Sequence, residues 1–272
     1  MRAPGAIQAQ RLSSRVRAAL ALSRAFAGPR SALTVRGLAR RAACGPPGVP
    51  VAVRVRELGG GEVWVRPGST DVSVLIDTFM RRFHLPPETV SAQDARTIWD
   101  LGANVGYTAA HLAALHPHAR VWAVELDGSN AELARRNLAA YGDRCRLLEA
   151  GVWVSEGTVR YRPDAGNEWG LRIVQDPQAD VGAGATAPAL TLNRLAELTG
   201  AERVDYVKMD IEGAEEQVLA SATEWAALVA AIKVEVHAPY STARCSEDLR
   251  ALGFRTLPDA RHPACVIGLR EP

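Results

Sequence analysis

Acidic residues are missing from the amino-terminal end of this 272-residue chain. No aspartate or glutamate comes before Glu57, whereas arginine recurs from Arg2 to Arg56. A stretch of one charge sign is typical of a tail or an added helix rather than of a packed core. We therefore predict a basic extension over residues 1–45 and a folded domain over residues 46–272. The extension fits a loosely helical or disordered tail, a targeting segment, a peripheral membrane contact or a docking site for a partner.

Cysteine and long apolar runs are also scarce. The four cysteines have no C-x-x-C spacing, so we predict no metal site on them and expect buried thiols at Cys145 and Cys265. Sparse cysteine is typical of a reducing compartment, and we expect a cytoplasmic protein. No stretch reaches the roughly 18 apolar residues of a membrane span. The net charge of +2 gives no indication of nucleic-acid binding.

Hydrophobic residues make up 47% of the chain, enough for a sizeable core, and their spacing changes along it. Residues 51–56 and 62–66 alternate between apolar and polar positions, which predicts a hairpin. From Thr97 onward, short strands alternate with helices, which predicts a mostly parallel α/β sheet. The segment 163–189 contains proline, glycine and aspartate and is predicted to be a long loop.

The predicted strands of the sheet are 97–101, 120–125, 145–154, 204–209 and 229–236, with a closing hairpin over 254–257 and 265–269. The predicted helices are 107–115, 129–141, 214–221 and 246–252.

The first predicted strand of the sheet ends in the turn Asp100-Leu-Gly-Ala-Asn-Val-Gly106. Gly102 permits a tight turn and a close backbone approach, Gly106 opens the next helix beside the ligand, and we expect unpaired amides there. The spacing differs from the G-x-G-x-x-G of dinucleotide sites, and the Asp100 carboxylate would repel a diphosphate. A cofactor with cationic groups and no phosphate, such as S-adenosylmethionine, suits this carboxylate. A purely structural glycine turn is the alternative.

Two further positions follow the next strands. Glu125 stands about 20 residues after the glycine turn, where a carboxylate suits hydrogen bonding to ribose hydroxyls. The alternative for Glu125 is a solvated acid at a helix start. Gly151 follows the third strand, where an adenine ring would border the sheet, and we predict that it contacts the cofactor.

A second polar group lies in the segment Tyr206-Val-Lys-Met-Asp-Ile-Glu-Gly-Ala-Glu-Glu216. Lys208 and Asp210 share one face of the predicted strand, and Gly213 permits a sharp turn, so Asp210 and Glu212 are expected to face the acceptor. Asp210 is alternatively a helix cap. His237 ends the next strand, and with an ordinary pKa near 6.5 it is either a general base or a hydrogen-bonded loop residue.

Asp210, Glu212 and His237 also suggest a metal, because oxygen ligands with one imidazole suit Mg²⁺ or Mn²⁺. No compact ligand motif accompanies them, so we assign no metal-binding residues and keep Mg²⁺ as an optional cofactor. The remaining histidines are predicted to be surface or packing residues; they are His84, His111, His116, His118 and His262.

With these motifs in order, the chain resembles the FkbM-type methyltransferase family. The similar stretches are Arg66–Asp71, Ile98–Thr108, Val124–Glu125, Val207–Glu215 and Val234–His237. The resemblance implies a seven-stranded Rossmann-like sheet with a carboxyl-terminal antiparallel hairpin. It also implies donor-binding residues, namely Asp100, Gly102, Asn104, Gly106 and Glu125, and residues that face the acceptor, namely Lys208, Asp210, Glu212 and His237.

The resemblance implies S-adenosylmethionine-dependent O-methylation of a hydroxyl on a small molecule, a natural product or a glycan. His237 or Asp210 is then the candidate base, and Lys208 or Glu212 orients the acceptor. The alternative is a non-catalytic adenosylmethionine-binding module that acts through a partner protein. The intact polar residues at the acceptor edge favour the enzyme, and the sequence leaves the oligomeric state open.

Overall fold

We describe a computed structural model of the chain that covers residues 20–40, 47–164, 167–173 and 184–270, without the side chains of 163–172. The chain forms two compact units, residues 1–82 and 83–272. Parts of the predicted basic extension, residues 1–19 and 41–45, lie outside the described residues, so its role stays a prediction. In the described part of the chain, no helix has both the length and the apolar character that a membrane crossing requires.

The first unit contains the predicted hairpin. Strands β1 (Val51–Arg54) and β2 (Glu62–Val65) pair antiparallel, and Gly59 takes the left-handed conformation in the connection. The other elements are α2 (Gly28–Leu38), η1 (Arg56–Leu58), α3 (Asp71–Ile76) and η2 (Asp77–Arg81). Asp71, in the first turn of α3, is buried and pairs with Arg66 at 2.7 Å.

The second unit contains the main sheet. Its strands are β3 (Thr97–Leu101), β4 (Arg120–Glu125), β5 (Cys145–Glu149), β10 (Tyr206–Met209), β11 (Ala231–Glu235), β12 (Arg255–Pro258) and β13 (Cys265–Leu269). They form one sheet in the order β12-β13-β11-β10-β3-β4-β5. The strands from β11 to β5 are parallel, and β13 runs antiparallel between β11 and β12. This arrangement confirms the predicted fold class, including the closing hairpin.

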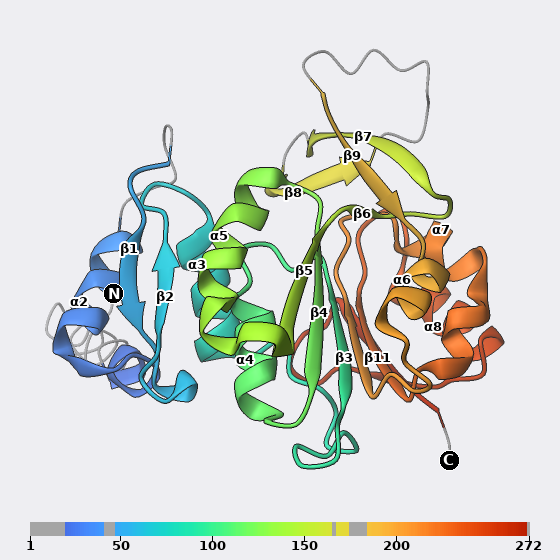
Figure 1. Ribbon diagram of the computed structural model, residues 1–272, viewed down its shortest axis with the longest axis horizontal. Helices are drawn as coiled ribbons and strands as arrows, with labels where there is room; N and C mark the ends of the chain where they lie inside the picture. The colour runs from blue at the N-terminus through green and yellow to red at the C-terminus, as the bar shows by residue number, and fades with distance from the viewer. Residues whose placement is uncertain (1–19, 41–46, 165–166, 174–183, 271–272) are drawn as a thin grey trace, which may run out of the picture. The chain divides into compact units, whose positions relative to one another are not determined.

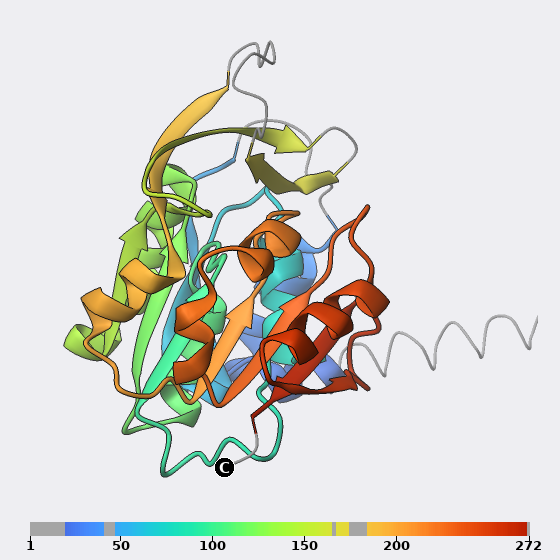
Figure 2. The same cartoon turned by 90° about the vertical axis from the view of Figure 1, so that its right-hand side faces the viewer.

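Helices cover both faces of this sheet. They are α4 (Tyr107–Leu115), α5 (Gly128–Leu138), α6 (Leu192–Thr199), α7 (Glu215–Ala220) and α8 (Thr242–Ala251), with the short turns η3 (Ala139–Arg144) and η4 (Thr223–Leu228). Helices α4 and α5 lie on one face, and α6, α7 and α8 lie on the other (Figures 1 and 2). Because both faces are covered, strand β10 is buried along its whole length, as parallel strands in such folds are.

Residues 163–164, 167–173 and 185–189 of the segment predicted as a long loop belong to a second sheet, so that prediction is wrong for them; residues 174–183 lie outside the described residues. Strands β6 (Gly151–Val152), β7 (Gly157–Asp164), β8 (Asn167–Ile173) and β9 (Ala185–Leu190) pair in the order β6-β9-β7-β8. Alternate residues of β7 and β9 pack together, with Val159 and Tyr161 meeting Ala187 and Ala189. Small apolar residues between prolines and glycines concealed this alternation in the sequence. Figure 1 shows the second sheet beyond the carboxyl ends of the main strands, where β6 follows β5.

The main sheet brings the glycine turn and the end of β10 into direct backbone contact. Gly102 has a φ of 77°, and a Cβ at this position would lie 1.8 Å from the carbonyl oxygen of Asp210. The amide of Asp210 donates to the carbonyl of Leu101 at 3.0 Å. Any side chain at position 102 would therefore separate the two strand ends that the site is built on.

Replacing Gly102 by alanine tests this contact. Gly200→Ala is the matched control, because Gly200 also has a positive φ, of 58°, but an added Cβ meets nothing within 4 Å. We expect Gly200→Ala to lower the free energy of unfolding by about 1–2 kcal/mol, the cost of a left-handed residue. Gly102→Ala adds the backbone clash and should cost more than about 4 kcal/mol. Equal losses in urea unfolding of the two variants would contradict the contact.

Candidate functional site

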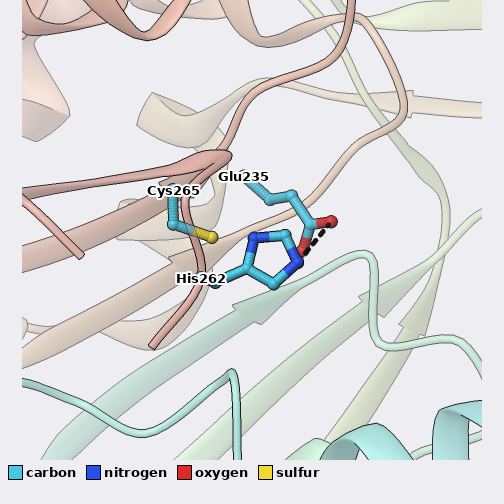
Figure 3. A group of neighbouring side chains, drawn as sticks. All are labelled: Glu235, His262 and Cys265. Carbon is cyan, nitrogen blue, oxygen red and sulfur yellow. Dashed lines mark ion pairs between the residues drawn. The ribbon is translucent and has the colours of Figure 1, made fainter. Parts of the chain in front are cut away.

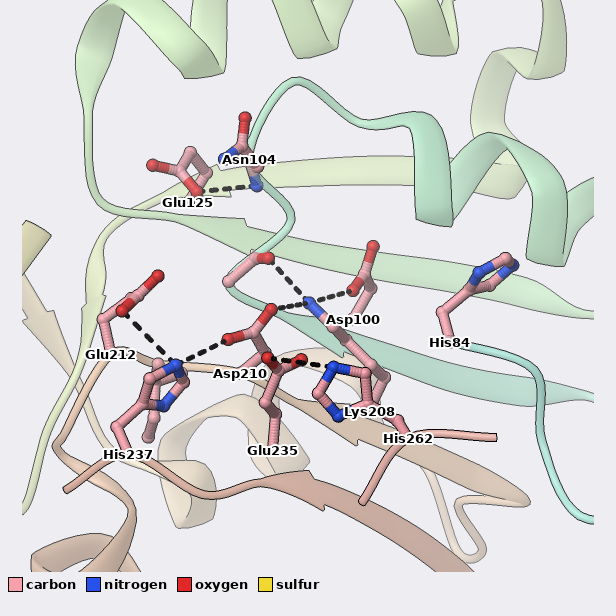
Figure 4. A network of polar contacts seen from close by, with 12 residues as sticks. His84, Asp100, Asn104, Glu125, Lys208, Asp210, Glu212, Glu235, His237 and His262 are labelled. Carbon is pink, nitrogen blue, oxygen red and sulfur yellow. Dashed lines mark hydrogen bonds and ion pairs between the residues drawn. The ribbon is translucent and has the colours of Figure 1, made fainter. Parts of the chain in front are cut away.

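The carboxyl edge of the main sheet gathers the glycine turn and the polar residues that follow β4, β10 and β11 (Figure 4). Its first component is the turn after β3. The amides of Gly102 and Ala103 both donate to the carbonyl of Val124, and that of Gly106 donates to Ala103. The amide of Asn104 donates to Glu125 at 2.8 Å, while that of Val105 donates to the side chain of Asn104.

The expectation of unpaired amides in this turn is therefore wrong for residues 102–106. The Glu125 carboxylate and the Asn104 side chain satisfy the donors that a phosphate would otherwise bind. The turn thus lacks the anion site of a dinucleotide fold, in agreement with its spacing.

Glu125 lies at the end of β4 and is only 6% exposed. One of its carboxylate oxygens accepts from Asn104, and the other accepts from the amide of Asp127 at 2.9 Å. Burial raises the pKa of Glu125 to about 7, against the opposing effect of these two backbone hydrogen bonds. Glu125 therefore shapes the glycine turn, and its carboxylate lies where the sequence placed a ribose ligand.

Two glycines assigned to the cofactor are required by packing. A Cβ on Gly106 would lie 3.1 Å from the backbone of Ala134, so this glycine lets α4 approach α5. A Cβ on Gly151 would lie 2.9 Å from the side chains of Leu126 and Val159. The structure thus gives both glycines a structural reason, and their contact with a cofactor stays a prediction.

Lys208 joins the glycine turn to the end of β10. Its ammonium donates to the carbonyl of Gly102 at 2.9 Å and lies 3.1 Å from Asp210 and 3.6 Å from Asp100. Burial disfavours the charged form, but the carboxylates of Asp210 and Asp100 outweigh this effect and raise the pKa of Lys208. Lys208 thus links the glycine turn to the end of β10, and its contact with an acceptor stays a prediction.

Asp100 is fully buried, and its carboxylate lies 3.6 Å from the ammonium of Lys208. Burial raises the pKa of Asp100 to about 6, although the charge of Lys208 opposes this. A buried carboxylate is costly unless a cation or a donor completes it. Lys208 supplies such a cation, and the contact of Asp100 with a cofactor stays a prediction.

His237 follows β11 and lies among three carboxylates. Its Nδ1 is 2.9 Å from Glu215, and its Nε2 is 3.4 Å from Glu212 and 3.7 Å from Asp210 (Figure 4). Burial lowers the pKa of His237, but the hydrogen bond to Glu215 and the charges of Asp210 and Glu212 outweigh it and raise this pKa to about 9. The ring is therefore an imidazolium at neutral pH.

Glu215 lies in the same segment as Asp210 and Glu212, and local sequence alone indicated no role for it. It is fully buried, and one carboxylate oxygen accepts from the amides of Ile211 and Gly213 as well as contacting His237. In this turn Glu212 has a φ of 53° and Gly213 a φ of 97°. Glu215 thus holds a left-handed turn and orients the imidazole. The sequence feature that could have indicated this role is the position of Glu215, immediately after the turn that Gly213 permits.

Glu235 also belongs to this cluster. Its carboxylate lies within 4.8 Å of ligand atoms of Asp210 and His237, and separately of His262 and Cys265. The charge of Asp210, and burial after it, raise the pKa of Glu235 to about 7. The contact of Glu235 with His262 depends on how β13 pairs with β11, which no local sequence pattern indicates.

The other histidines of the main unit fit the packing interpretation to different degrees. His84 and His111 are buried, and their rings lie 3.0 Å apart between Nε2 and Nδ1. His116 is also buried, whereas His118 is exposed.

Comparison with known proteins agrees with this architecture. The sequence model of the methyltransferase FkbM domain matches residues 100–256, which is more than half of the chain. The chain is similar to the 2-O-methyltransferase NoeI of Sinorhizobium fredii, with 27% identity over 140 residues, 47% of this chain and 57% of that protein. It is also similar to the O-methyltransferase imqG of Aspergillus flavus, with 41% identity over 51 residues, 18% of this chain and 21% of that protein. The chain thus spans less than two thirds of the length of either relative.

Solved structures show weaker likenesses. An O-methyltransferase family protein from Burkholderia thailandensis has a TM-score of 0.44 at 15% identity, over 74% of this chain and 58% of that one. The amino-terminal domain of EvdMO1 with SAH bound has a TM-score of 0.39 at 16% identity, over 65% and 76%. With TM-scores this low, the fold assignment rests on the strand order. From the family match and the site together, the chain belongs to the FkbM family of S-adenosylmethionine-dependent methyltransferases.

Proposed function

We propose that this protein transfers a methyl group from S-adenosylmethionine to a hydroxyl oxygen of a small-molecule or glycan acceptor. The observation that carries the proposal is the cluster of Asp210, Glu212 and His237 beside the glycine turn. It combines a proton acceptor and a fixed cation at the edge where ligands bind in parallel sheets. The two named relatives are O-methyltransferases, which supports oxygen as the methyl acceptor.

The residues present fit this donor. S-adenosylmethionine supplies, when bound, a methyl group on a cationic sulfonium together with an ammonium and no phosphate. Asp100 supplies a buried carboxylate beside Lys208, and the amides of the glycine turn are all engaged. The chain therefore presents negative charge and no phosphate site, which excludes a nicotinamide dinucleotide on chemical grounds. Glu125 is the ribose ligand in this proposal.

The acceptor proton goes to Asp210. A hydroxyl is a weak nucleophile until a base removes its proton, and an imidazolium has no lone pair to take it. Because the pKa of His237 is raised to about 9, Asp210 is the base of the pair at neutral pH. His237 stabilises the carboxylates of Asp210 and Glu212 and fixes their direction. Lys208 holds Asp210 at 3.1 Å, so the base is positioned before the acceptor arrives.

A magnesium ion at this cluster is an optional part of the proposal. Asp210, Glu235 and His237 have ligand atoms within 4.8 Å of one another. An imidazolium does not ligate a metal, so the ion would have to displace the proton of His237. The reaction described above needs no such ion, and an activity that survives metal chelation would remove Mg²⁺ from it.

A non-catalytic module that acts through a partner protein is the second candidate. It predicts donor binding without methyl transfer to any acceptor. Labelled methyl incorporation from cell extract, followed by identification of the product, distinguishes the two candidates and names the acceptor.

Asn replacement of Asp210 tests the base. We expect Asp210→Asn to reduce methyl incorporation by at least about 100-fold, the range for loss of a general base. Calorimetric titration should show that S-adenosylmethionine binding is retained within a few-fold. Asp143→Asn is the control, since the Asp143 side chain is fully exposed and lies outside the cluster. If Asp210→Asn transfers methyl groups as fast as the control, Asp210 is not the base.

Because His237 is protonated, its contribution to the stability of the folded protein should depend on pH in a defined direction. Its folded-state pKa of about 9 lies above the ordinary 6.5, so its stabilising effect is complete below pH 6.5 and disappears as the pH rises through 9. We expect an NMR titration of the ring to give a pKa near 9 and Glu215→Gln to lower it. Glu216→Gln, one residue further along α7, is the matched control and should leave it unchanged. A ring that titrates near 6.5 in the wild-type protein would refute the imidazolium.

A further inference from the structure

A tight turn leads into β13 and carries two side chains with metal-binding atoms. The segment is His262-Pro-Ala-Cys265, and the amide of Cys265 donates to the carbonyl of His262 at 2.9 Å. This bond closes the turn, so the imidazole and the thiol lie together (Figure 3). This H-x-x-C spacing runs against our prediction that the cysteines have no histidine at a metal-ligand interval and form no metal site.

The neighbouring strand supplies a third ligand. Glu235 of β11 pairs directly with Cys265 of β13 in the antiparallel register. Directly opposed residues of such a pair have Cβ atoms about 4.5–5.5 Å apart, so their side chains meet on one face. The Nε2 of His262 lies 3.9 Å from an oxygen of Glu235, and ligand atoms of all three residues lie within 4.8 Å of one another.

The position of the turn is fixed from outside the cluster. Asp259, three residues before His262, forms a buried ion pair with Lys233 of β11 at 2.8 Å. The ring of His262 packs edge-on against Phe83, with 4.5 Å between centroids. The Nδ1 of His262 is buried without a hydrogen-bond partner among the described residues. The imidazole is thus held in place by Phe83 and keeps a buried nitrogen that is available to a ligand.

We propose that Glu235, His262 and Cys265 form a site for a thiophilic divalent metal of the Zn²⁺ type. A thiolate with an imidazole and a carboxylate selects zinc-like ions and disfavours Mg²⁺ and Ca²⁺, which take oxygen ligands. Three protein ligands leave the fourth tetrahedral position to water or to a ligand oxygen. Binding takes up the metal and releases the thiol proton of Cys265 to solvent, so the site with Zn²⁺, thiolate and carboxylate is neutral.

Metal binding at these three residues requires only side-chain movement. Zinc bonds of about 2.0–2.3 Å in a tetrahedron place ligand atoms roughly 3.3–3.8 Å apart. The ligand atoms of the three residues lie within 4.8 Å of one another, so they need to move closer by about 1 Å. The Glu235 side chain is 31% exposed and that of His262 20% exposed, so both can move and the metal has an approach. Cys265 is 3% exposed and forms the inner wall. This site does not depend on the proposed methyl transfer, although Glu235 joins it to the acceptor edge.

Cobalt binding to the full-length, metal-stripped protein tests the proposal. We expect one equivalent of Co²⁺ to give the near-ultraviolet thiolate charge-transfer band and the visible bands of a tetrahedral ion, and Zn²⁺ to displace it. Cys265→Ser and His262→Gln should each weaken binding by more than the roughly 10–100-fold that loss of an outer-shell partner costs. Cys245→Ser is the matched control, because Cys245 is also a buried thiol, in α8, and lies outside the cluster.

Three outcomes would overturn the site. The first is that the thiolate band is absent in the wild-type protein, and the second is that it persists in Cys265→Ser. The third is that cobalt binding is lost in His237→Gln but kept in His262→Gln. The last result would place the metal at Asp210, Glu235 and His237 instead. Circular dichroism of each variant shows whether it is folded. If Cys265→Ser perturbs the core, His262→Gln still tests the site, because His262 is partly exposed.

Discussion

At the carboxyl edge of the main sheet, two backbones meet with no side chain between them. The carbonyl of Asp210 occupies the space that a Cβ on Gly102 would need, and the ammonium of Lys208 binds the carbonyl of that same glycine. Through this contact the glycine turn and the turn that follows β10 are held together. The positions of Asp100 and Asp210 depend on it, because each lies at one of these two strand ends.

The second constraint is electrostatic. Five carboxylates, those of Asp100, Asp210, Glu212, Glu215 and Glu235, lie around two cations, Lys208 and His237. Burial opposes charge on Lys208 and His237, but the neighbouring acids outweigh it and keep both cations protonated. The same excess suits a cationic methyl donor and opposes a phosphate. It also explains why Glu235 can serve a metal on its other side, where His262 and Cys265 lie.

Local patterns were sufficient for most of the sheet. The strands Thr97–Leu101 and Arg120–Glu125 and the helix Tyr107–Leu115 have the predicted bounds, since apolar runs and the glycine turn mark them. The second sheet was missed because its alternation is carried by small residues such as Ala187 and Ala189 among breakers. Gly106 and Gly151 were assigned to the cofactor, yet packing against Ala134 and Leu126 already requires them.

The sequence by itself determined the fold class, the family motifs and the set of residues at the carboxyl edge, because strand periodicity and turn residues are local properties. Only the tertiary structure decided what these residues do to one another. The protonation of His237 depends on Glu215, and the group of Glu235, His262 and Cys265 depends on the register of two strands. Charge interactions and burial act through space between residues distant in sequence, so no local pattern contains them.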